Sequence, residues 1–577
     1  MERTWHCAWT GARANAMVSD GVAMSENLSS ISARSGVRHG VFARMCAAAD
    51  ASGTAETPEV MRRLGLESRF GDAMTHGVVS FYDRLRKEDA GKKVWICNGT
   101  ACLCAGTQKS LRGELRKHFS EDEIGTACCL GRCHEARAFQ YRGRNFSGIA
   151  PSSLAEVFGP AGVEDAGCAH AVVSALEVPQ LTAPFPGLDA FYQPLRDMAG
   201  RTREWLAGEL RDSGLRGRGG AGFPVHLKWQ ACRTAPGPEK YVVCNADEGD
   251  PGSFIDRYLM EERPHSVLSG MIAAAWFAGA ETGILYIRSE YPESIRRMEA
   301  AIAELHASGW LGNDNQGGGF KLDLIVVKGA GAYICGEETA LLASIEGQRP
   351  EVRVRPPWPT SHGLFGKPTI VNNVETFANI HTILARGGKA FAGIGTPTCT
   401  GPKLLSLDGH FVTPGIQEVA MGTPLEEVVA LAGGFRKPVK ALQIGGPLGC
   451  VVPLGRIAGL RVDFESFHDA GFLLGHGGVI AIPEGFPMIR LIEHLFQFTA
   501  DESCGKCFPC RLGTLRGREL VSRAIAGDGF RIDRKLMEDL LETLAETSLC
   551  GLGGGLPLPV RNILEHFTDE LRPYFKD

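Results

Sequence analysis

The sequence has no hydrophobic run long enough to cross a membrane. Its longest strongly apolar stretch lies around residues 271–280 and is well short of the roughly 20 residues that a membrane-spanning helix needs. The N-terminal residues also lack the apolar core of a secretory signal peptide. We therefore expect a cytoplasmic protein that does not span a membrane.

An excess of positive charge is missing as well. The 577 residues include 61 Lys and Arg against 66 Asp and Glu, which gives a formal net charge of -5 at pH 7. Nucleic acids and acidic membrane surfaces attract basic proteins, so neither is expected as a general partner. A chain of this length exceeds a single hydrophobic core, and several domains are expected.

Disulfide bonds are not the expected use of the 18 cysteines, because disulfides are rare in proteins that are not exported. Eight cysteines fall into two groups with short spacings, four between residues 97 and 133, where Cys104 and Cys128 lie next to them, and four between residues 504 and 550. Metal or iron-sulfur ligation explains such groups better than disulfides do. Scattered cysteines such as Cys46 and Cys399 are expected to be buried thiols.

A glycine-rich stretch, residues 213–224, surrounds Arg216 and Arg218. Glycine has no Cβ, so its main-chain N–H groups can approach an anion directly, and the arginines add positive charge. The stretch therefore predicts a phosphate-binding loop. A mobile loop or a tight turn has a similar composition, and for this stretch alone both alternatives stay open.

Two further polar, glycine-rich stretches, residues 245–252 and 329–339, each follow an apolar run rich in β-branched residues. The runs, 241–244 and 324–327, are typical of buried parallel strands. Loops at the carboxyl ends of such strands form the binding crevice of an α/β sheet. The sequence therefore predicts that these loops gather at one ligand site.

Together with Pro356-Pro-Trp-Pro and Asn372-Asn-Val-Glu-Thr, these stretches resemble the family of flavin-bearing, NADH-oxidising subunits in respiratory complex I, the NAD-linked hydrogenases and the NAD-linked, metal-dependent formate dehydrogenases. The resemblance covers about residues 75–565 and implies a multidomain α/β fold. The expected order is a poorly ordered extension (1–56), a helical lead-in with a thioredoxin-like 2Fe-2S domain (57–165), a linker (166–200), a Rossmann-like FMN and NAD domain (201–398), a β-grasp (SLBB-like) domain with its connection (399–485), and a helical 4Fe-4S bundle (486–577). The β-grasp domain is expected only to pack.

The resemblance also implies the residues that hold the flavin. Those expected to bind FMN are Gly217, Arg218, Gly219, Lys228, Asn245, Asp247, Glu248, Tyr333, Gly336, Glu337, Asn372 and Asn373. Asp250 and Glu338 would flank the incoming nicotinamide as catalytic residues. Flavin supplies the hydride chemistry, while such residues fix its orientation and tune its electronics.

For the adenine end of NAD, the resemblance implies Phe223, Arg355 and Trp358. An aromatic face can stack on a purine for about 1 to 3 kcal/mol, although Trp358 could instead pack into the core of a proline-rich corner. The sequence departs from the family pattern in this region. Val225-His226 replaces the usual Thr-Gly, and Ala231 stands where a second aromatic residue is common.

Two cysteine sets are the expected iron-sulfur ligands. Cys97, Cys102, Cys129 and Cys133 would hold a 2Fe-2S cluster, and Cys504, Cys507, Cys510 and Cys550 a 4Fe-4S cluster. The C-x4-C and C-x3-C pairs and the C-x2-C-x2-C run are spacings that iron-sulfur proteins use. A four-thiolate zinc site is the alternative for both sets, and reduced structural cysteines are a further one for the first.

The resemblance implies a diaphorase subunit that passes electrons between nicotinamide and iron-sulfur clusters through FMN. The Asn-Ala-Asp-Glu-Gly-Asp stretch, with aspartate at Asp250, resembles the NAD-dependent formate dehydrogenases. These would add a catalytic alpha subunit with a molybdenum or tungsten pterin and further iron-sulfur clusters. The alternatives are the diaphorase subunit of a bidirectional NAD-reducing hydrogenase, a complex I-type NADH dehydrogenase, and a zinc-stapled scaffold without catalytic activity.

Overall fold

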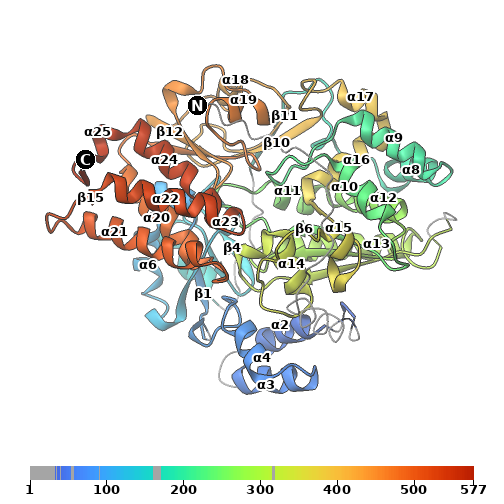
Figure 1. Cartoon of the computed structure of the whole chain (residues 1–577), viewed down its shortest axis with the longest axis horizontal. Helices are drawn as coiled ribbons and strands as arrows, with labels where there is room; N and C mark the ends of the chain where they lie inside the picture. Colours follow the sequence, from blue (N-terminus) through green and yellow to red (C-terminus); the bar gives the residue numbers. More distant parts are fainter. Residues whose placement is uncertain are drawn as a thin grey trace, which may run out of the picture.

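The computed structural model describes residues 33, 36–38, 40–52, 57–89, 91–159, 170–314 and 319–576. Figure 1 shows four parts. The central sheet with its helices, residues 201–398 (green to yellow, the flavin-type domain), lies beside the domain that holds the first cysteine group, residues 91–159 (cyan). A second sheet, mostly in residues 402–483 (orange), and the C-terminal helices (red) pack against both. Among these described residues, no helix is long and apolar enough to span a membrane.

A parallel sheet of order β8-β7-β6-β9 forms the centre of the flavin-type domain. Its strands are β6 (Tyr241–Ala246), β7 (Thr282–Ile287), β8 (Asp323–Lys328) and β9 (Thr369–Asn373). The helices around it are α9 (Arg203–Ser213), α10 (Val225–Thr234), α11 (Ile255–Glu262), α12 (Pro264–Ala278), α13 (Pro292–Ala307), α14 (Glu338–Ile345), α15 (Pro359–His362), α16 (Val374–Arg386) and α17 (Gly388–Ala392). The apolar stretch around residues 271–280 lies mostly in α12, which is buried almost along its whole length.

Alternate residues of the central strands point to opposite faces of the sheet, as the two-residue period of a strand requires. Val242 and Cys244 belong to the core under α12 and α16. Tyr241 and Val243 belong to a second core under α14 and the N-terminal helices. Helices therefore cover both faces, which confirms the predicted α/β arrangement.

A mixed six-stranded sheet, of order β13-β12-β14-β10-β11-β5, follows the flavin-type domain. Its strands are β5 (Ala171–Ser174), β10 (Pro402–Leu407), β11 (Gly415–Ala420), β12 (Val439–Ile444), β13 (Cys450–Pro453) and β14 (Gly478–Pro483), with helices α18 (Leu425–Leu431) and α19 (Phe464–Asp469). Its core includes Leu405, Val419, Leu442 and Phe467. All strands of this sheet except β5 lie in the predicted β-grasp segment.

The two cysteine groups lie in different elements. The first domain has a sheet of order β2-β1-β3-β4, with β1 (Val94–Cys97), β2 (Ile124–Ala127), β3 (Phe139–Tyr141), β4 (Arg144–Phe146) and helices α5 (Thr100–Cys104), α6 (Gln108–Leu115) and α7 (Leu154–Phe158). The C-terminal segment has α20 (Met488–Asp501), a π-helical turn η8 (Pro509–Gly513), α21 (Thr514–Ala526), α22 (Arg534–Thr547), α23 (Gly551–Gly555), α24 (Pro557–His566) and α25 (Thr568–Leu571), with a short β15–β16 pair (Ile532–Asp533 and Phe575–Lys576).

Part of the predicted N-terminal extension forms a helix. Most of the predicted extension, including residues 1–32, lies outside the described residues, but α2 (Val41–Ser52) buries Val41, Phe42 and Met45 in the core under the flavin-type sheet. Helices α3 (Thr57–Glu67) and α4 (Asp72–Val79) continue this layer. The sequence gives only a weak helical pattern for α2, because it has few large apolar residues among many small ones.

The prediction of an irregular linker over residues 166–200 is wrong in part, because this segment contains a strand and a helix. Residues 160–169 lie outside the described residues, but β5 pairs in parallel with β11. Helix α8 (Leu188–Ala199) buries Tyr192, Leu195 and Met198. The proline-rich composition hid this helix, because Pro194 lies inside it and proline normally ends a helix.

Candidate functional site

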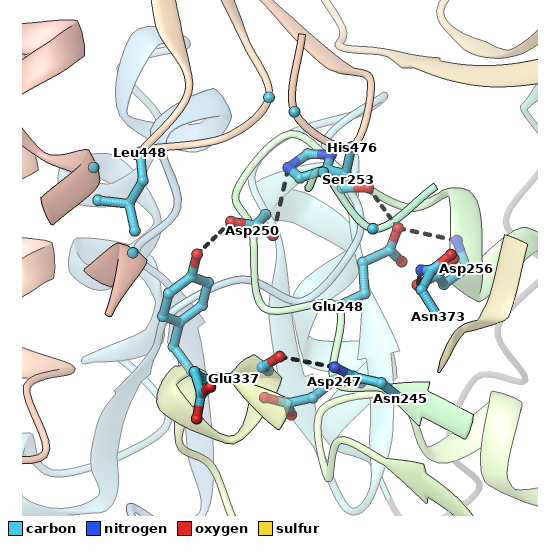
Figure 2. Close-up of a pocket in the computed structure, with 18 of the residues that line it drawn as sticks. Asn245, Asp247, Glu248, Asp250, Ser253, Asp256, Glu337, Asn373, Leu448 and His476 are labelled. Carbon is cyan, nitrogen blue, oxygen red and sulfur yellow. Dashed lines mark hydrogen bonds and ion pairs between the residues drawn. The ribbon is translucent and has the colours of Figure 1, made fainter. Parts of the chain in front are cut away.

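A cavity of about 340 Å³ lies where the carboxyl ends of β6 and β9 meet loops of the six-stranded sheet and α23 (Figure 2). Many of the residues predicted from the sequence line it together: Arg218, Gly219, Asn245, Asp247, Glu248, Asp250, Tyr333, Gly336, Glu337 and Asn373. The residues predicted to bind FMN or NAD that do not line it are Gly217, Phe223, Lys228, Glu338, Arg355, Trp358 and Asn372. The three polar loops therefore meet at one site, as predicted for the two that follow the buried strands β6 and β8.

The glycine-rich loop brings a buried guanidinium to this cavity. Only 1% of Arg218 is exposed, and its Nη2 donates to the carbonyl oxygens of Thr400 and Pro402. Its Nε and Nη1 have no hydrogen-bond partner among the described residues. Burial lowers the pKa of this guanidinium. Unpartnered donors on a buried cation suit an anionic ligand such as a phosphate.

Close approach of the backbone explains one glycine of this loop. A Cβ on Gly219 would lie 3.1 Å from the Cβ of Asn373, at the carboxyl end of β9. The backbone N–H of Arg218 is held by the hydroxyl of Thr376, 2.9 Å away in the first turn of α16. The loop is thus fixed against the N-terminus of α16, where main-chain N–H groups favour anions.

The loop after β6 supplies acidic and amide groups to the floor of the cavity. Asn245 Nδ2 donates to the Gly336 carbonyl oxygen at 2.7 Å. Asp247 Oδ2 is buried and has no hydrogen-bond partner in the described part of the chain. Burial raises the pKa of Asp247 well above its usual range. An unsatisfied carboxyl oxygen of this kind fits a ligand that donates a hydrogen bond.

Glu248 reaches the cavity wall, but its carboxylate is largely occupied by the protein. Oε1 accepts from the Ser253 hydroxyl and, at 3.0 Å, from the Asp256 N–H. Oε2 accepts from the Arg257 N–H at 3.1 Å and from the Tyr291 hydroxyl at 3.2 Å. The geometry indicates that Glu248 mainly anchors the start of α11.

Three side chains from three different elements meet above the floor of the cavity. The Tyr333 hydroxyl donates to Asp250 Oδ1 at 2.8 Å, and His476 Nε2 lies 3.5 Å from Asp250 Oδ2 (Figure 2). A Cβ on Gly446 would approach Asp250 Oδ1 to 2.8 Å and His476 Nε2 to 2.9 Å. Burial first, and then the charge of Asp250, raise the pKa of Tyr333 well above its usual range.

Glu338 and Lys228 pair with each other outside the cavity lining. Lys228 Nζ lies 3.3 Å from Glu338 Oε2, and Arg355 Nη1 lies 3.0 Å from Glu338 Oε1. Its neighbour Glu337 lines the cavity and caps α14 by accepting from the N–H groups of Thr339 and Ala340. The two consecutive glutamates therefore face different surroundings.

The predicted adenine-binding residues lie at the surface near this ion-pair cluster. Trp358 is 54% exposed and Phe223 is 51% exposed. The guanidinium of Arg355 lies over the Trp358 ring, 5.3 Å from its centroid. Core packing of Trp358 is therefore wrong. Asn372 does not line the cavity. Its Oδ1 accepts a hydrogen bond from Trp229 Nε1 at 3.0 Å within the domain.

The first cysteine group lies in a buried cluster beside the cavity. Cys97, Cys102, Cys129 and Cys133 are at most 3% exposed, and the Sγ atoms of Cys129 and Cys133 are 3.7 Å apart. The neighbouring Cys128 points elsewhere, with its Sγ 3.6 Å from the carbonyl oxygen of Gly249. Cys128 therefore has a contact of its own with the loop after β6.

The second cysteine group adjoins the cavity directly. Cys504, Cys507, Cys510 and Cys550 lie in one cluster, and Cys550 lines the cavity. Burial raises the pKa of Cys510 to about 11 and that of Cys550 to about 12. Because metal ligation requires thiolates, an iron-sulfur cluster would have to supply the positive charge that stabilises them.

Several lining residues were not predicted from the sequence. They are Gly220, Ser253, Ile255, Asp256, Ile334, Glu375, Gly445, Leu448, Leu473, Gly475, His476, Gly551, Leu552 and Gly555. His476 and Leu448 come from the six-stranded sheet, so the expectation that this domain only packs is wrong. The glycine-rich sequence Leu474-Gly-His-Gly-Gly leads into β14; it indicates a loop but not what that loop faces.

Three family descriptions match separate parts of the chain. The Nuo51 FMN-binding domain matches residues 210–382, the thioredoxin-like 2Fe-2S ferredoxin matches residues 57–160, and the NADH-ubiquinone oxidoreductase-F iron-sulfur binding region matches residues 490–574. These matches confirm the predicted fold class and the cofactors FMN, 2Fe-2S and 4Fe-4S, and NAD binding is typical of the family.

Relatives and solved structures share these parts. The chain is 42% identical over 390 residues to an NADH-quinone oxidoreductase F-type subunit of Rhizobium meliloti, covering 67% of this chain and 92% of that protein. It is 34% identical over 538 residues to the HoxS subunit alpha of the NAD-reducing hydrogenase of Cupriavidus necator, covering 88% of both. A chain of an air-oxidized NAD+-reducing NiFe-hydrogenase superposes with a TM-score of 0.81 at 29% identity, covering 92% of this chain and 93% of that one.

Proposed function

The chain belongs to the family of the complex I 51 kDa subunit and carries in addition a thioredoxin-like 2Fe-2S domain, and from this premise we propose that it exchanges electrons between NAD(H) and a separate catalytic subunit. It is an oxidoreductase subunit of the NADH-dehydrogenase type with FMN and iron-sulfur clusters. The relatives described above are subunits of multi-subunit enzymes, which supports a partner for this chain.

The cavity residues fit FMN. Arg218 offers two unpartnered N–H donors and Asp247 an unpartnered carboxyl oxygen among the described residues, and Gly219 allows the backbone to approach Asn373 closely. We propose that Arg218 and the N-terminus of α16 hold the phosphate, while Asn245 and Asp247 bond the more polar parts of the flavin. When bound, FMN accepts a hydride from NADH and passes on its two electrons singly.

The observation that carries the proposal is the position of Cys550. This predicted 4Fe-4S ligand lines the same cavity as the predicted flavin residues. The 2Fe-2S segment touches the site from another side, because a Cβ on Gly99 would lie 3.3 Å from the Cβ of Pro251, next to Asp250. We therefore propose that Cys550, with Cys504, Cys507 and Cys510, would hold the 4Fe-4S cluster beside the flavin, where it would supply one-electron transfer.

The proposal for the catalytic partner rests on how much of this chain its hydrogenase relatives match. The hydrogenase subunit alpha and the hydrogenase chain of known structure match this chain across the fused 2Fe-2S domain as well. This favours hydrogen as the second substrate and a hydrogenase as the partner, over the formate dehydrogenase expected from the sequence. Formate stays as a second candidate because of the aspartate at position 250, and a molybdenum or tungsten subunit would then be the partner.

The test is to purify the chain with the proteins that accompany it and to assay NAD+ reduction anaerobically with H2 and with formate in parallel. Reduction with H2, together with nickel in the purified complex, supports the leading proposal. Reduction only with formate assigns the second candidate. A preparation that contains FMN and iron but reduces no one-electron acceptor with NADH would contradict both.

A further inference from the structure

A donor and an acceptor face each other on the cavity wall without being fully paired. His476 Nε2 is buried and makes no hydrogen bond to the described residues, and it lies 3.5 Å from Asp250 Oδ2, beyond good hydrogen-bond length. The other Asp250 oxygen already accepts from Tyr333. One histidine nitrogen and one carboxylate oxygen are thus left side by side at the cavity (Figure 2).

The backbone sets which histidine nitrogen is the donor. The N–H of Gly478 donates to His476 Nδ1 at 3.1 Å, so Nδ1 acts as an acceptor. In the neutral imidazole, Nε2 then carries the proton. Because Gly478 begins β14, the sheet holds the ring with Nε2–H directed toward Asp250.

A glycine packs closely against this pair. Gly446 has a φ of +83°, a conformation that favours glycine. Any Cβ at this position would meet both Asp250 and His476 at less than 3.0 Å. A larger residue at position 446 would therefore displace Asp250 or His476.

We infer that His476 and Asp250 together bind a planar amide edge, in which a carbonyl oxygen lies next to an N–H group. The carbonyl oxygen accepts from His476 Nε2–H, and the N–H group donates to Asp250 Oδ2, so each protein group gains the partner that it lacks. This inference rests on the proposed function, which brings two such edges to the cavity. They are the carboxamide of nicotinamide and the pyrimidine edge of the flavin.

Of the two edges, the nicotinamide carboxamide is the one we expect. Asn245 at the end of β6 and Asn373 at the end of β9 lie on the strand-end side of the cavity, whereas His476 belongs to a loop of the six-stranded sheet. A flavin held from the strand-end side leaves the opposite wall to the second ligand. His476 would then be a positioning residue that sets the orientation of the nicotinamide ring.

The experiment compares His476→Ala and His476→Gln with the wild-type holoenzyme complex. Binding of NADH, of reduced thionicotinamide adenine dinucleotide and of ADP-ribose is measured at equilibrium, alongside FMN affinity of the apoprotein. One lost neutral hydrogen bond should weaken NADH binding in the alanine variant about five- to tenfold. ADP-ribose lacks nicotinamide, so its binding should not change, and Gln should restore part of the loss through its amide N–H.

Two further comparisons identify the edge that binds. Sulfur is a weak acceptor, so the thionicotinamide analogue should be less sensitive to His476→Ala than NADH is. If instead FMN affinity falls about tenfold and NADH binding to the reconstituted enzyme is unchanged, the pair binds the flavin edge, and the assignment to nicotinamide is overturned. His468→Ala, which alters an exposed histidine of α19, is the matched control.

The inference is overturned if His476→Ala changes neither NADH nor FMN binding more than His468→Ala does. It is also overturned if ADP-ribose binding weakens as much as NADH binding, because the effect would then be general to the site. In either case flavin bleaching by NADH in the wild type would still test the proposed function separately.

Discussion

Replacing Arg218 by methionine should weaken FMN binding by about two to four orders of magnitude. The Nε and Nη1 donors of Arg218 have no partner among the described residues, and Arg218 is one of the residues that line the cavity. A hydrogen bond to a charged acceptor contributes about 1.5 to 3 kcal/mol. Two such bonds to a phosphate give about 3 to 6 kcal/mol, and about 1.4 kcal/mol corresponds to a tenfold change in the dissociation constant.

The same substitution should change the stability of the apoprotein much less. Methionine removes a buried charge that is costly without a ligand. It also leaves the carbonyl oxygens of Thr400 and Pro402 without their donor from Arg218, at a cost of about 1 to 3 kcal/mol for each buried acceptor. These opposing effects partly cancel, so weaker FMN binding without a large loss of thermal stability is the diagnostic pattern.

The assay is a titration of flavin-free protein with FMN, followed by quenching of flavin fluorescence. Arg211→Met, at an exposed position of α9, provides the matched control and should bind FMN like the wild type. A dissociation constant for Arg218→Met within about threefold of the control would refute the assignment of this guanidinium to the phosphate.

Three further changes test other parts of the molecule. Glu338→Gln removes the carboxylate that Lys228 and Arg355 share. Because the two partly exposed pairs together contribute about 1 to 2 kcal/mol, NADH oxidation should slow about five- to thirtyfold with FMN retained; an unchanged rate would remove Glu338 from the nucleotide site. Cys507→Ser should abolish the 4Fe-4S EPR signal but leave flavin reduction by NADH intact, and a full signal would contradict the ligand set. Burial lowers the pKa of His381 to about 4, so the unfolded state binds this proton more tightly. The free energy of unfolding is therefore unaffected by His381 above about pH 6.5 and falls by about 3 kcal/mol as the pH drops toward 4. His381→Gln should flatten that decline in thermal melts, and an identical pH profile would contradict the cause.

The strand-end loops could be predicted because local signals and fold agree there. Apolar β-branched residues at 241–244 and 324–327 became β6 and β8, and the polar residues after them line one cavity. Parallel strands place their carboxyl ends at the same edge. Asn245, Asp247 and Tyr333 therefore converge for a reason that is visible in the sequence.

The residues supplied by other domains could not be predicted in this way. His476 and Leu448 reach the cavity only because the six-stranded sheet packs against the flavin-type domain, and no local pattern encodes that packing. Glu248 shows the opposite case, a predicted ligand residue whose carboxylate the protein itself occupies. Its sequence context suggests a ligand contact, but its oxygens are taken by groups at the start of α11 and by Tyr291, which become neighbours only after folding.

The most direct test of the central proposal is an anaerobic NADH titration of the purified holoenzyme, followed by visible absorption and low-temperature EPR. We predict that NADH bleaches the flavin and generates a reduced 4Fe-4S signal, and that Cys550→Ser keeps the bleaching but loses this signal. Flavin bleaching without any reduced cluster in the wild type, or four-thiolate sites that contain zinc and no iron, would contradict electron transfer from the flavin cavity through Cys550.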